Sequence, residues 1–312
     1  MTAMRDVWAD TLIELMAADP RVLVLDGDLG TSTRADRIAA ANPGQFFQMG
    51  IAEQNMVGVA AGLAANGYVP WLSSFAVFLT HRALDQVRML LAQPGANVKL
   101  AGHYAGLLTG QTGKTHQDVQ DIAIMRAMPG MTVLAPADAV ECARAVRWAT
   151  AQTGPVYLRL HRDPGPCVFE AGLSANAQLR PVVILRRGDD VTLVSTGAQS
   201  GRTLAAAERL AAGGVEATVV HLPVLKPVDV GAIDDAIGSG RPVFSVEEHS
   251  VIGGLGSLLA EVIASRPDGR VLHRIGIDDT WGESAPNDAL LARHGLTPQD
   301  IATRVTRSVA NR

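Results

Sequence analysis

The chain has 312 residues, of which 47% are hydrophobic and only 4% aromatic, so we expect globular cores packed mainly from Ala, Val and Leu. Single cores stop growing at about 250–300 residues, which predicts two domains. The formal net charge of −4, without a basic run, argues against nucleic acid as a partner. No signal-peptide pattern and no apolar stretch near the ~20 residues of a membrane span are found. Cys142 and Cys167 are isolated, so we expect reduced core thiols in a cytoplasmic protein.

Helical periodicity and short apolar runs alternate along the chain, which predicts α/β domains built on parallel sheets. In the first part we expect strands at 22–25, 46–49, 71–74, 98–102, 132–135 and 156–160, and helices at 6–18, 53–66, 75–92, 119–127 and 138–152. A Pro- and Gly-containing linker at 166–182 is expected to separate a domain of residues 1–165 from one of residues 183–312. The second domain is expected to hold strands at 191–195, 217–221, 243–247 and 271–275, and helices at 200–212, 229–238, 254–265 and 298–307.

Several chemically capable residues fall at or just beyond the ends of expected strands, where α/β sheets carry their functional loops. They are Asp26, Glu53, Phe75, His103 and Arg162. Glu53 lies in a run of small and apolar residues that solvates a carboxylate poorly, so it should have a partner or a raised pKa. Its alternative role is a helix-start Glu near the positive end of the helix dipole. Asp26 and Asp28 after the first strand could each be a helix cap or form an Asx-turn, and we favour this for Asp26.

The segment Gly50-Ile51-Ala52-Glu53-Gln54-Asn55-Met56 resembles the cofactor-activating segment of thiamine diphosphate enzymes of the transketolase family. The resemblance continues, in order, at 74–78, 115–121, 128–131, 136–138, 247–250, 253–256 and 282–284. It implies a pyrimidine-binding domain followed by a transketolase C-terminal domain. In that family a buried Glu hydrogen-bonds the cofactor's aminopyrimidine, and the resemblance gives this role to Glu53.

The same resemblance assigns the remaining cofactor contacts. Phe75 and Phe78, three residues apart at a helix start, would hold the pyrimidine, although apolar pairs at this spacing are often plain core. His81 stands where the family usually has Tyr, and it could equally be a surface residue. Asp28 would lie near the thiazolium. His116, within Thr115-His116-Gln117, would contact the donor hydroxyl at the reacting carbon.

The family's residues that bind the distal anion of the substrate have weaker matches in this sequence. The resemblance suggests His103, in a loop about one residue longer than expected, and Arg162, Arg5 and Ser32. Surface or capping roles are as probable for Arg5 and Ser32. Thr112 replaces the Asp that reads the sugar's configuration in common transketolases, and Lys114 adds a charge that could meet an anion or be solvated. These differences leave the sugar open.

The sequence lacks the Gly-Asp-Gly signature of the domain that holds the cofactor's diphosphate and Mg²⁺. We therefore expect the C-terminal subunit of a split transketolase, in an α₂β₂ assembly whose N-terminal partner supplies that site. The expected reaction is transfer of a two-carbon ketol unit from a ketose to an aldose. The alternatives are a β subunit of a 2-oxo acid dehydrogenase E1 component, a fragment similar to 1-deoxyxylulose-5-phosphate synthase, and a degenerate regulatory subunit.

Overall fold

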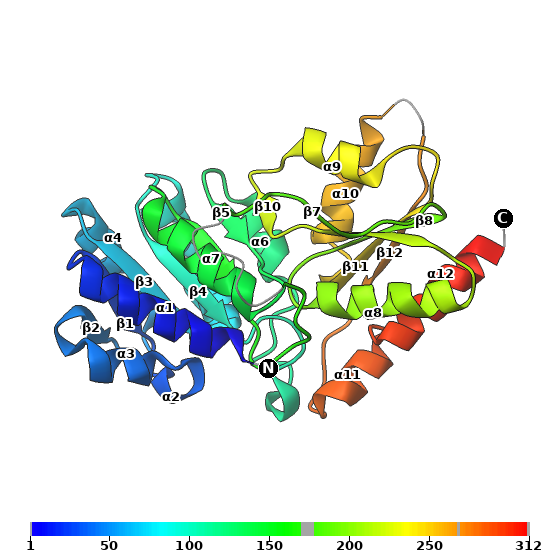
Figure 1. Ribbon diagram of the computed structural model, residues 1–312. Helices are drawn as coiled ribbons and strands as arrows, with labels where there is room; N and C mark the ends of the chain where they lie inside the picture. Colours follow the sequence, from blue (N-terminus) through cyan, green and yellow to red (C-terminus); the bar gives the residue numbers. More distant parts are fainter. Residues whose placement is uncertain (1, 170–177, 267–268, 311–312) are drawn as a thin grey trace.

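The computed structural model describes residues 2–169, 178–266 and 269–310, so residues 170–177 of the expected linker lie outside the described residues. Two α/β units lie side by side, each built on one sheet (Figure 1). The first sheet has seven strands in the order β10-β5-β6-β4-β3-β1-β2, and the second has five in the order β12-β11-β8-β9-β7. The predicted fold of two parallel-dominated sheets is therefore confirmed.

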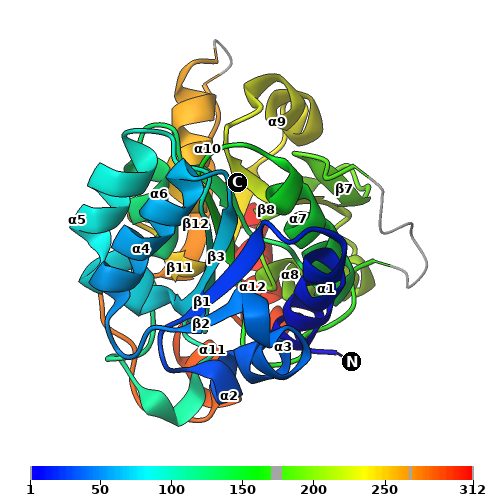
Figure 2. The same cartoon turned by 90° about the vertical axis from the view of Figure 1, so that its left-hand side faces the viewer.

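The first sheet lies between two helical layers. Its consecutive strands are β1 (Val22–Asp26), β2 (Phe46–Gln48), β3 (Val69–Phe75), β4 (Lys99–His103), β5 (Thr132–Leu134) and β6 (Val156–Arg159). One face carries α1 (Met4–Ala18), α3 (Ala35–Ala41) and α7 (Ala139–Ala151), and the other carries α4 (Glu53–Ala65), α5 (Leu84–Gln86) and α6 (Asp121–Ala127) (Figure 2). A short helix, α2 (Gly30–Thr33), follows β1. Both faces of the strands are apolar because both are covered.

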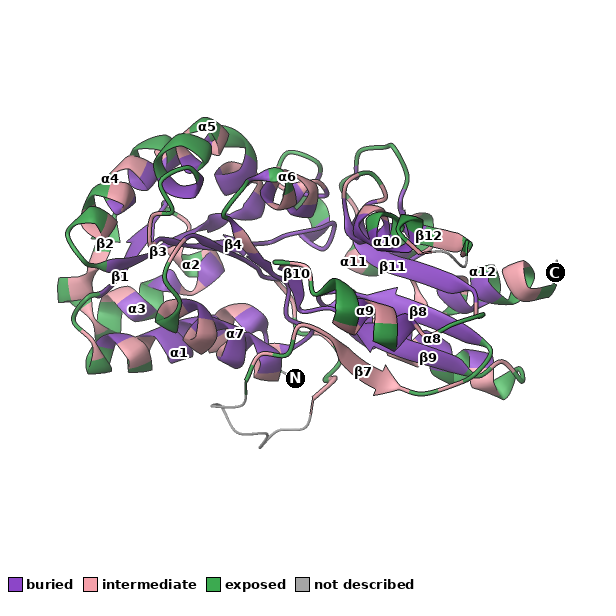
Figure 3. Cartoon of the chain, turned by 90° about the horizontal axis from the view of Figure 1, so that it is seen from above, coloured by how far each residue is buried: buried purple, intermediate pink, exposed green. Residues whose placement is uncertain are grey.

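The second sheet is covered in the same way. Its strands are β7 (Val183–Arg186), β8 (Val191–Ser195), β9 (Ala217–His221), β11 (Val243–Ser250) and β12 (Leu272–Ile277). Helices α8 (Gln199–Ala212) and α12 (Pro298–Ala310) pack together in one hydrophobic core of this unit. Helices α9 (Val230–Ile237) and α10 (Leu255–Ala264) contribute to a second hydrophobic core. Helix α11 (Asn287–Arg293) lies beside the first unit's loops. Figure 3 shows the central strands of both sheets buried between partly exposed helices.

Three features differ from the expected pattern. Strand β10 (Val224–Lys226) comes from the second half of the chain but pairs antiparallel with β5 at the edge of the first sheet. Strand β7 also pairs antiparallel, with β9, so neither sheet is wholly parallel. The helix expected at 75–92 is divided into π-helical turns at Phe78–Arg82 and Val87–Ala92 on either side of α5. Such turns are frequent at functional sites.

The two cysteines differ in their environments. Cys142 is a buried free thiol, as predicted, whereas Cys167 is exposed, so its assignment to the core was wrong. Among the described residues, no helix is both long enough and apolar enough to cross a bilayer.

Candidate active site

Glu53 is the first residue of α4, and its side chain is completely buried. Arg82 Nη1 donates to Glu53 Oε2 at 2.7 Å, and the Ser74 hydroxyl donates to Oε1 at 3.2 Å. The predicted partner of this carboxylate is therefore confirmed, and it is a cation contributed by the first π-helical turn. A Cβ atom built on Gly27 would lie 3.2 Å from the Ser74 hydroxyl and 3.5 Å from Glu53 Oε1. The bare backbone at the end of β1 therefore leaves space beside the carboxylate.

An aromatic wall, formed by Phe75, Phe78, Tyr104 and His116, adjoins this carboxylate. The rings of Phe75 and Phe78 stack with centroids 5.8 Å apart, so the predicted shared face is confirmed. Tyr104 stacks on Phe75 at 4.1 Å, and His116 meets both Phe rings edge-on. The Thr115 hydroxyl lies 2.9 Å from His116 Nδ1, which leaves Nε2 for another partner. The Arg82 guanidinium lies over the Phe78 ring at 4.2 Å and links the wall to Glu53.

A cavity of about 740 Å³ opens against this wall. It is lined by residues of both units: Leu29, Ser32, Phe75, Tyr104, Thr109, Gly110, Gln111, Thr112, His116, Arg162, Pro286 and Asn287. Most come from loops that follow strands, as predicted for an α/β site. Pro286 and Asn287 of the second unit were not anticipated, because no motif pointed to them.

Three of the expected anion-binding residues, Arg5, Ser32 and Arg162, meet near Tyr104, and two of them, Ser32 and Arg162, line the cavity. Arg5 Nη1 donates to the backbone carbonyl of Ser32 at 2.8 Å and to the Tyr104 hydroxyl at 3.1 Å. Arg162 Nε donates to the same hydroxyl at 3.0 Å, and its Nη1 lies 3.4 Å from Asp163 Oδ1. Two guanidinium groups and one carboxylate thus give this end of the cavity a net positive charge.

His103 does not line the cavity. It ends β4, is buried, and its ring meets the Trp8 ring edge-on at 4.7 Å. Burial, and secondarily the charge of Arg5, lowers the pKa of His103 to about 3, so the ring is neutral. The next residue, Tyr104, lies in the aromatic wall in place of His103. The sequence held a signal for this difference of one position, because the loop before Thr115-His116-Gln117 is one residue longer than expected. Counting back from His116 by the expected loop length gives Tyr104 and not His103.

Other expected site residues lie elsewhere or are already engaged. His81 makes no ring contact with the Phe pair among the described residues and lines a second groove of about 1030 Å³ with Gln54 and Arg82. Its Nε2 lies 3.5 Å from Asp118 Oδ1, and this carboxylate raises the pKa of His81. The Thr112 hydroxyl lines the cavity but donates to Thr109 within its own loop. Two further candidates, Lys114 and Asp28, are exposed and absent from the cavity lining.

Asp26 has the role that we favoured for it. Its Oδ2 accepts the Leu29 backbone N–H at 3.0 Å and the Gln48 side-chain amide at 3.2 Å. Burial raises the pKa of Asp26. This carboxylate therefore shapes the turn after β1 and does not face the cavity.

The second unit supports the loop of residues 104–115, here called the cavity loop, on the side away from the cavity wall. Glu248 Oε1 accepts the backbone N–H groups of Leu107 and Leu108 at 2.9 and 3.3 Å, and the Ser284 hydroxyl donates to the carbonyl of Gln111 at 2.6 Å. Asn287 Nδ2 donates to Asp163 Oδ2 at 2.6 Å. These contacts attach loops of the first unit, around Leu107, Gln111 and Asp163, to residues of the second unit beside the cavity.

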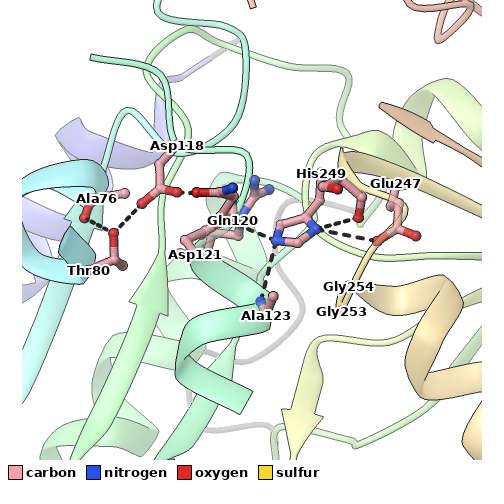
Figure 4. A network of polar contacts seen from close by, with 12 residues as sticks. Ala76, Thr80, Asp118, Gln120, Asp121, Ala123, Glu247, His249, Gly253 and Gly254 are labelled. Carbon is pink, nitrogen blue, oxygen red and sulfur yellow. Dashed lines mark hydrogen bonds and ion pairs between the residues drawn. The ribbon is translucent and has the colours of Figure 1, made fainter. Parts of the chain in front are cut away.

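Buried charges underlie this contact between the units (Figure 4). Asp118 accepts the Thr80 hydroxyl and the Gln120 backbone N–H, and His249 lies between Asp121 and Glu247. Glu247 also accepts the Leu255 and Gly256 N–H groups at the start of α10, at 2.6 and 2.8 Å. These contacts give Glu247 and His249 a structural role at the junction of the two units.

Comparison with known proteins identifies the family. The transketolase pyrimidine-binding domain matches residues 1–166, and the transketolase C-terminal domain matches residues 181–301. The chain is 40% identical to a putative transketolase C-terminal section of Methanocaldococcus jannaschii, over 97% of this chain and 95% of the relative. It is 38% identical to a 6-deoxy-6-sulfo-D-fructose transketolase subunit of a Clostridium species (strain MSTE9), over 99% and 95%.

A solved structure gives the same result. A split-gene transketolase, described as an inactive β4 tetramer, matches the fold with a TM-score of 0.87 at 40% identity, covering 99% of this chain and 98% of the other. The chain therefore belongs to the transketolase family, and its two domains correspond to the C-terminal section of a split transketolase.

Proposed function

We propose that this chain is the C-terminal subunit of a thiamine diphosphate-dependent transketolase that acts with an N-terminal partner, as α₂β₂. The partner would supply the diphosphate site and the Mg²⁺ ligands. The observation that carries the proposal is the buried, ion-paired carboxylate of Glu53 beside the stacked Phe75 and Phe78 rings. A similar chain solved without activity as a β4 tetramer supports the need for a partner.

The residues present fit the pyrimidine end of the cofactor. The glycine at position 27 keeps a side chain away from Glu53 Oε1, and the Phe75 and Phe78 rings are apolar surfaces suited to a flat heterocycle. Glu53 would share a proton with the pyrimidine N1′, and Arg82 donates to the other oxygen of this carboxylate. A buried carboxylate does this well because low dielectric strengthens the hydrogen bond.

Thiamine diphosphate, held at its pyrimidine end by Glu53, Phe75 and Phe78, would supply the nucleophilic carbon needed to cleave the ketose between C2 and C3 and to join the two-carbon unit to the aldehyde carbon of the acceptor, while the shortened aldose leaves. His116 lines the cavity and its Nδ1 is engaged by Thr115, so we propose that its Nε2 accepts the proton of the donor's C3 hydroxyl during cleavage and returns it to the acceptor's oxygen. The net reaction needs no oxidant or reductant.

The donor is proposed to be an anionic ketose. Arg5 and Arg162 provide guanidinium groups at the cavity, and Arg matches phosphate and similar oxyanions by paired N–H donors. Relatives named as transketolases of a sulfonated sugar and of a sugar phosphate are consistent with such a site. The particular sugar stays open, since Thr112 offers no carboxylate.

The test is ketol transfer by this chain with and without its co-encoded partner, with thiamine diphosphate, Mg²⁺ and ketose phosphates, sulfonated ketoses and pyruvate as donors. We expect activity on a ketose only with the partner. Glu53→Gln should lower kcat by at least about a hundredfold, a typical contribution of a positioned proton-transfer group. Glu208→Gln, on the exposed side of α8, is the matched control and should have no effect. Turnover of pyruvate alone would instead identify a 2-oxo acid dehydrogenase subunit.

A further inference from the structure

A smaller cavity, of about 260 Å³, lies at the junction of the two units. It shares no lining residue with the cavity at the aromatic wall. Its volume is below the roughly 300–1,000 Å³ of pockets for drug-sized ligands, so it suits an ion or a very small molecule. Its lining includes Glu141 and Arg144 of α7, Val183 of β7, and Phe169, Leu179 and Arg180 from the chain between these two elements.

Arg144 brings an unused pair of hydrogen-bond donors to this cavity. The residue lies in the second turn of α7 and is only 8% exposed. Its Nε and Nη2 are both buried and have no hydrogen-bond partner in the described part of the chain. These two nitrogens form one edge of the planar guanidinium group, so their N–H bonds point the same way. A buried cation with unpaired donors costs free energy, which a bound acceptor would offset.

The charged groups around Arg144 favour an anion. Arg180 adds a second guanidinium group, and Glu141 is the one carboxylate among the described lining residues. Glu141 Oε2 already accepts the Ala137 backbone N–H at 2.7 Å and lies 2.7 Å from His221 Nε2, so this carboxylate has partners of its own. Two cations and one engaged carboxylate give the cavity a net positive charge.

Apolar side chains complete the lining. Phe169, Leu179 and Val183 offer a surface of low dielectric, beside which a charge-assisted hydrogen bond is stronger than in water. The Arg144 guanidinium carbon lies 5.8 Å from the centre of the Phe169 ring. Asp138 Oδ2 accepts the backbone N–H of Phe169 at 2.8 Å, which fixes this part of the wall next to α7.

We propose that this cavity binds a small oxyanion, as a phosphate or carboxylate group, through the Nε and Nη2 donors of Arg144, with Arg180 as the second cation. Paired N–H donors on one edge of a guanidinium group match two oxygens of either anion. The proposal is independent of the ketol transfer proposed above, because no residue of the site at Glu53 and the aromatic wall takes part in it.

The test is calorimetric titration of the full chain with inorganic phosphate and with propionate, in a chloride buffer. All proteins carry Arg162→Gln, which weakens anion binding at the other cavity. Adding Arg144→Gln should weaken binding of the preferred anion roughly tenfold or more, as expected for the loss of hydrogen bonds from a charged group. Arg147→Gln, three residues further along α7 and paired with Glu14, is the matched control and should leave the affinity unchanged.

Thermal unfolding gives a second measurement. The preferred anion, at a hundred times its Kd, should raise the thermal midpoint of the Arg162→Gln protein by roughly 4 °C and should not raise that of the double variant with Arg144→Gln. Without anion, the two midpoints should agree within about 2 °C, since Arg144 gives up no hydrogen bond.

Each result supports or overturns the proposal. Equal affinities with and without Arg144→Gln would overturn it, and so would the absence of binding by the Arg162→Gln protein. An anion-free double variant that unfolds several degrees lower, or does not fold, would show that Arg144 has a structural role, which also overturns it. Tighter binding of phosphate or of propionate identifies the group that the cavity prefers.

Discussion

The buried ion pair between Arg159 and Asp121, within the first unit and next to its contact with the second, should contribute strongly to the stability of the fold. Arg159 Nε lies 2.7 Å from Asp121 Oδ2, and both side chains are almost inaccessible, at 2% and 0% exposure. Arg159 also donates to the backbone carbonyl of Glu248 at 2.9 Å, and the Glu248 side chain accepts a backbone N–H of the cavity loop, that of Leu107. Arg159→Met would therefore leave the Asp121 carboxylate buried, with the Tyr157 hydroxyl as its remaining hydrogen-bond donor among the described residues and His249 Nε2 3.9 Å away.

The expected cost is about 3–5 kcal/mol, typical for an ion pair broken by removing one buried partner. This corresponds to a fall in the thermal midpoint of roughly 10 °C. The matched control is Arg186→Met, which removes an equally short pair with Glu216 at 2.6 Å, but one whose side chains are 25% and 53% exposed. It should cost at most about 1 kcal/mol. Urea and thermal unfolding followed by circular dichroism measure both variants.

Two results would refute this reasoning. The first is an Arg159→Met variant no less stable than Arg186→Met, which would show that burial does not decide the energy of these pairs. The second concerns Asp121→Asn introduced into the Arg159→Met background. Because Asn carries no charge, the double variant should recover part of the lost stability. Further destabilisation would show that the unpaired charge is not the cause.

Three further predictions follow from the site. Replacing His103 with Phe should leave the donor KM unchanged and make stability less sensitive to acid. The pKa of His103 is lowered in the folded chain, so the unfolded chain binds more protons and the native chain loses stability as pH falls below about 6.5. Thermal midpoints of both proteins across pH 3–7 would measure this difference. Arg82→Gln removes the charge paired with Glu53 and should lower kcat about tenfold with little change in donor KM, measured by coupled assay. Asn287→Ala should raise the donor KM severalfold without changing kcat, since it removes a cavity amide.

Local patterns allowed much of the fold to be predicted. The apolar runs at Val22–Asp26 and Val191–Ser195 are strands within one residue of their expected ends. Strand β10 could not be anticipated, because Val224–Lys226 is only three residues long and gains its partner from β5, far back in the chain. Short segments that pair non-locally carry little periodicity of their own.

The site shows the same division between local and distant information. The sequence indicated that Glu53 needs a partner, but Arg82 became identifiable only when the π-helical turn brought it to the carboxylate. The choice between His103 and Tyr104 depended on where one extra loop residue is accommodated. His103 ends β4 and packs on Trp8, whereas Tyr104, just after the strand with φ of 58°, stacks on Phe75 at the cavity, so a shift of one position exchanges a cavity-lining residue for a core residue.

The cavity is lined by residues of both domains, so under the proposed function we expect both domains to contribute to sugar specificity. Thr112 stands in place of the family's carboxylate, yet its hydroxyl is directed to Thr109. Asn287, from the second domain, lines the same cavity, and its Oδ1 is a buried acceptor without a partner among the described residues. A buried acceptor of this kind costs free energy unless a ligand donates to it. The loss of an acceptor on the first domain is thus accompanied by a free one on the second, and a sugar hydroxyl is the donor that this cavity would admit.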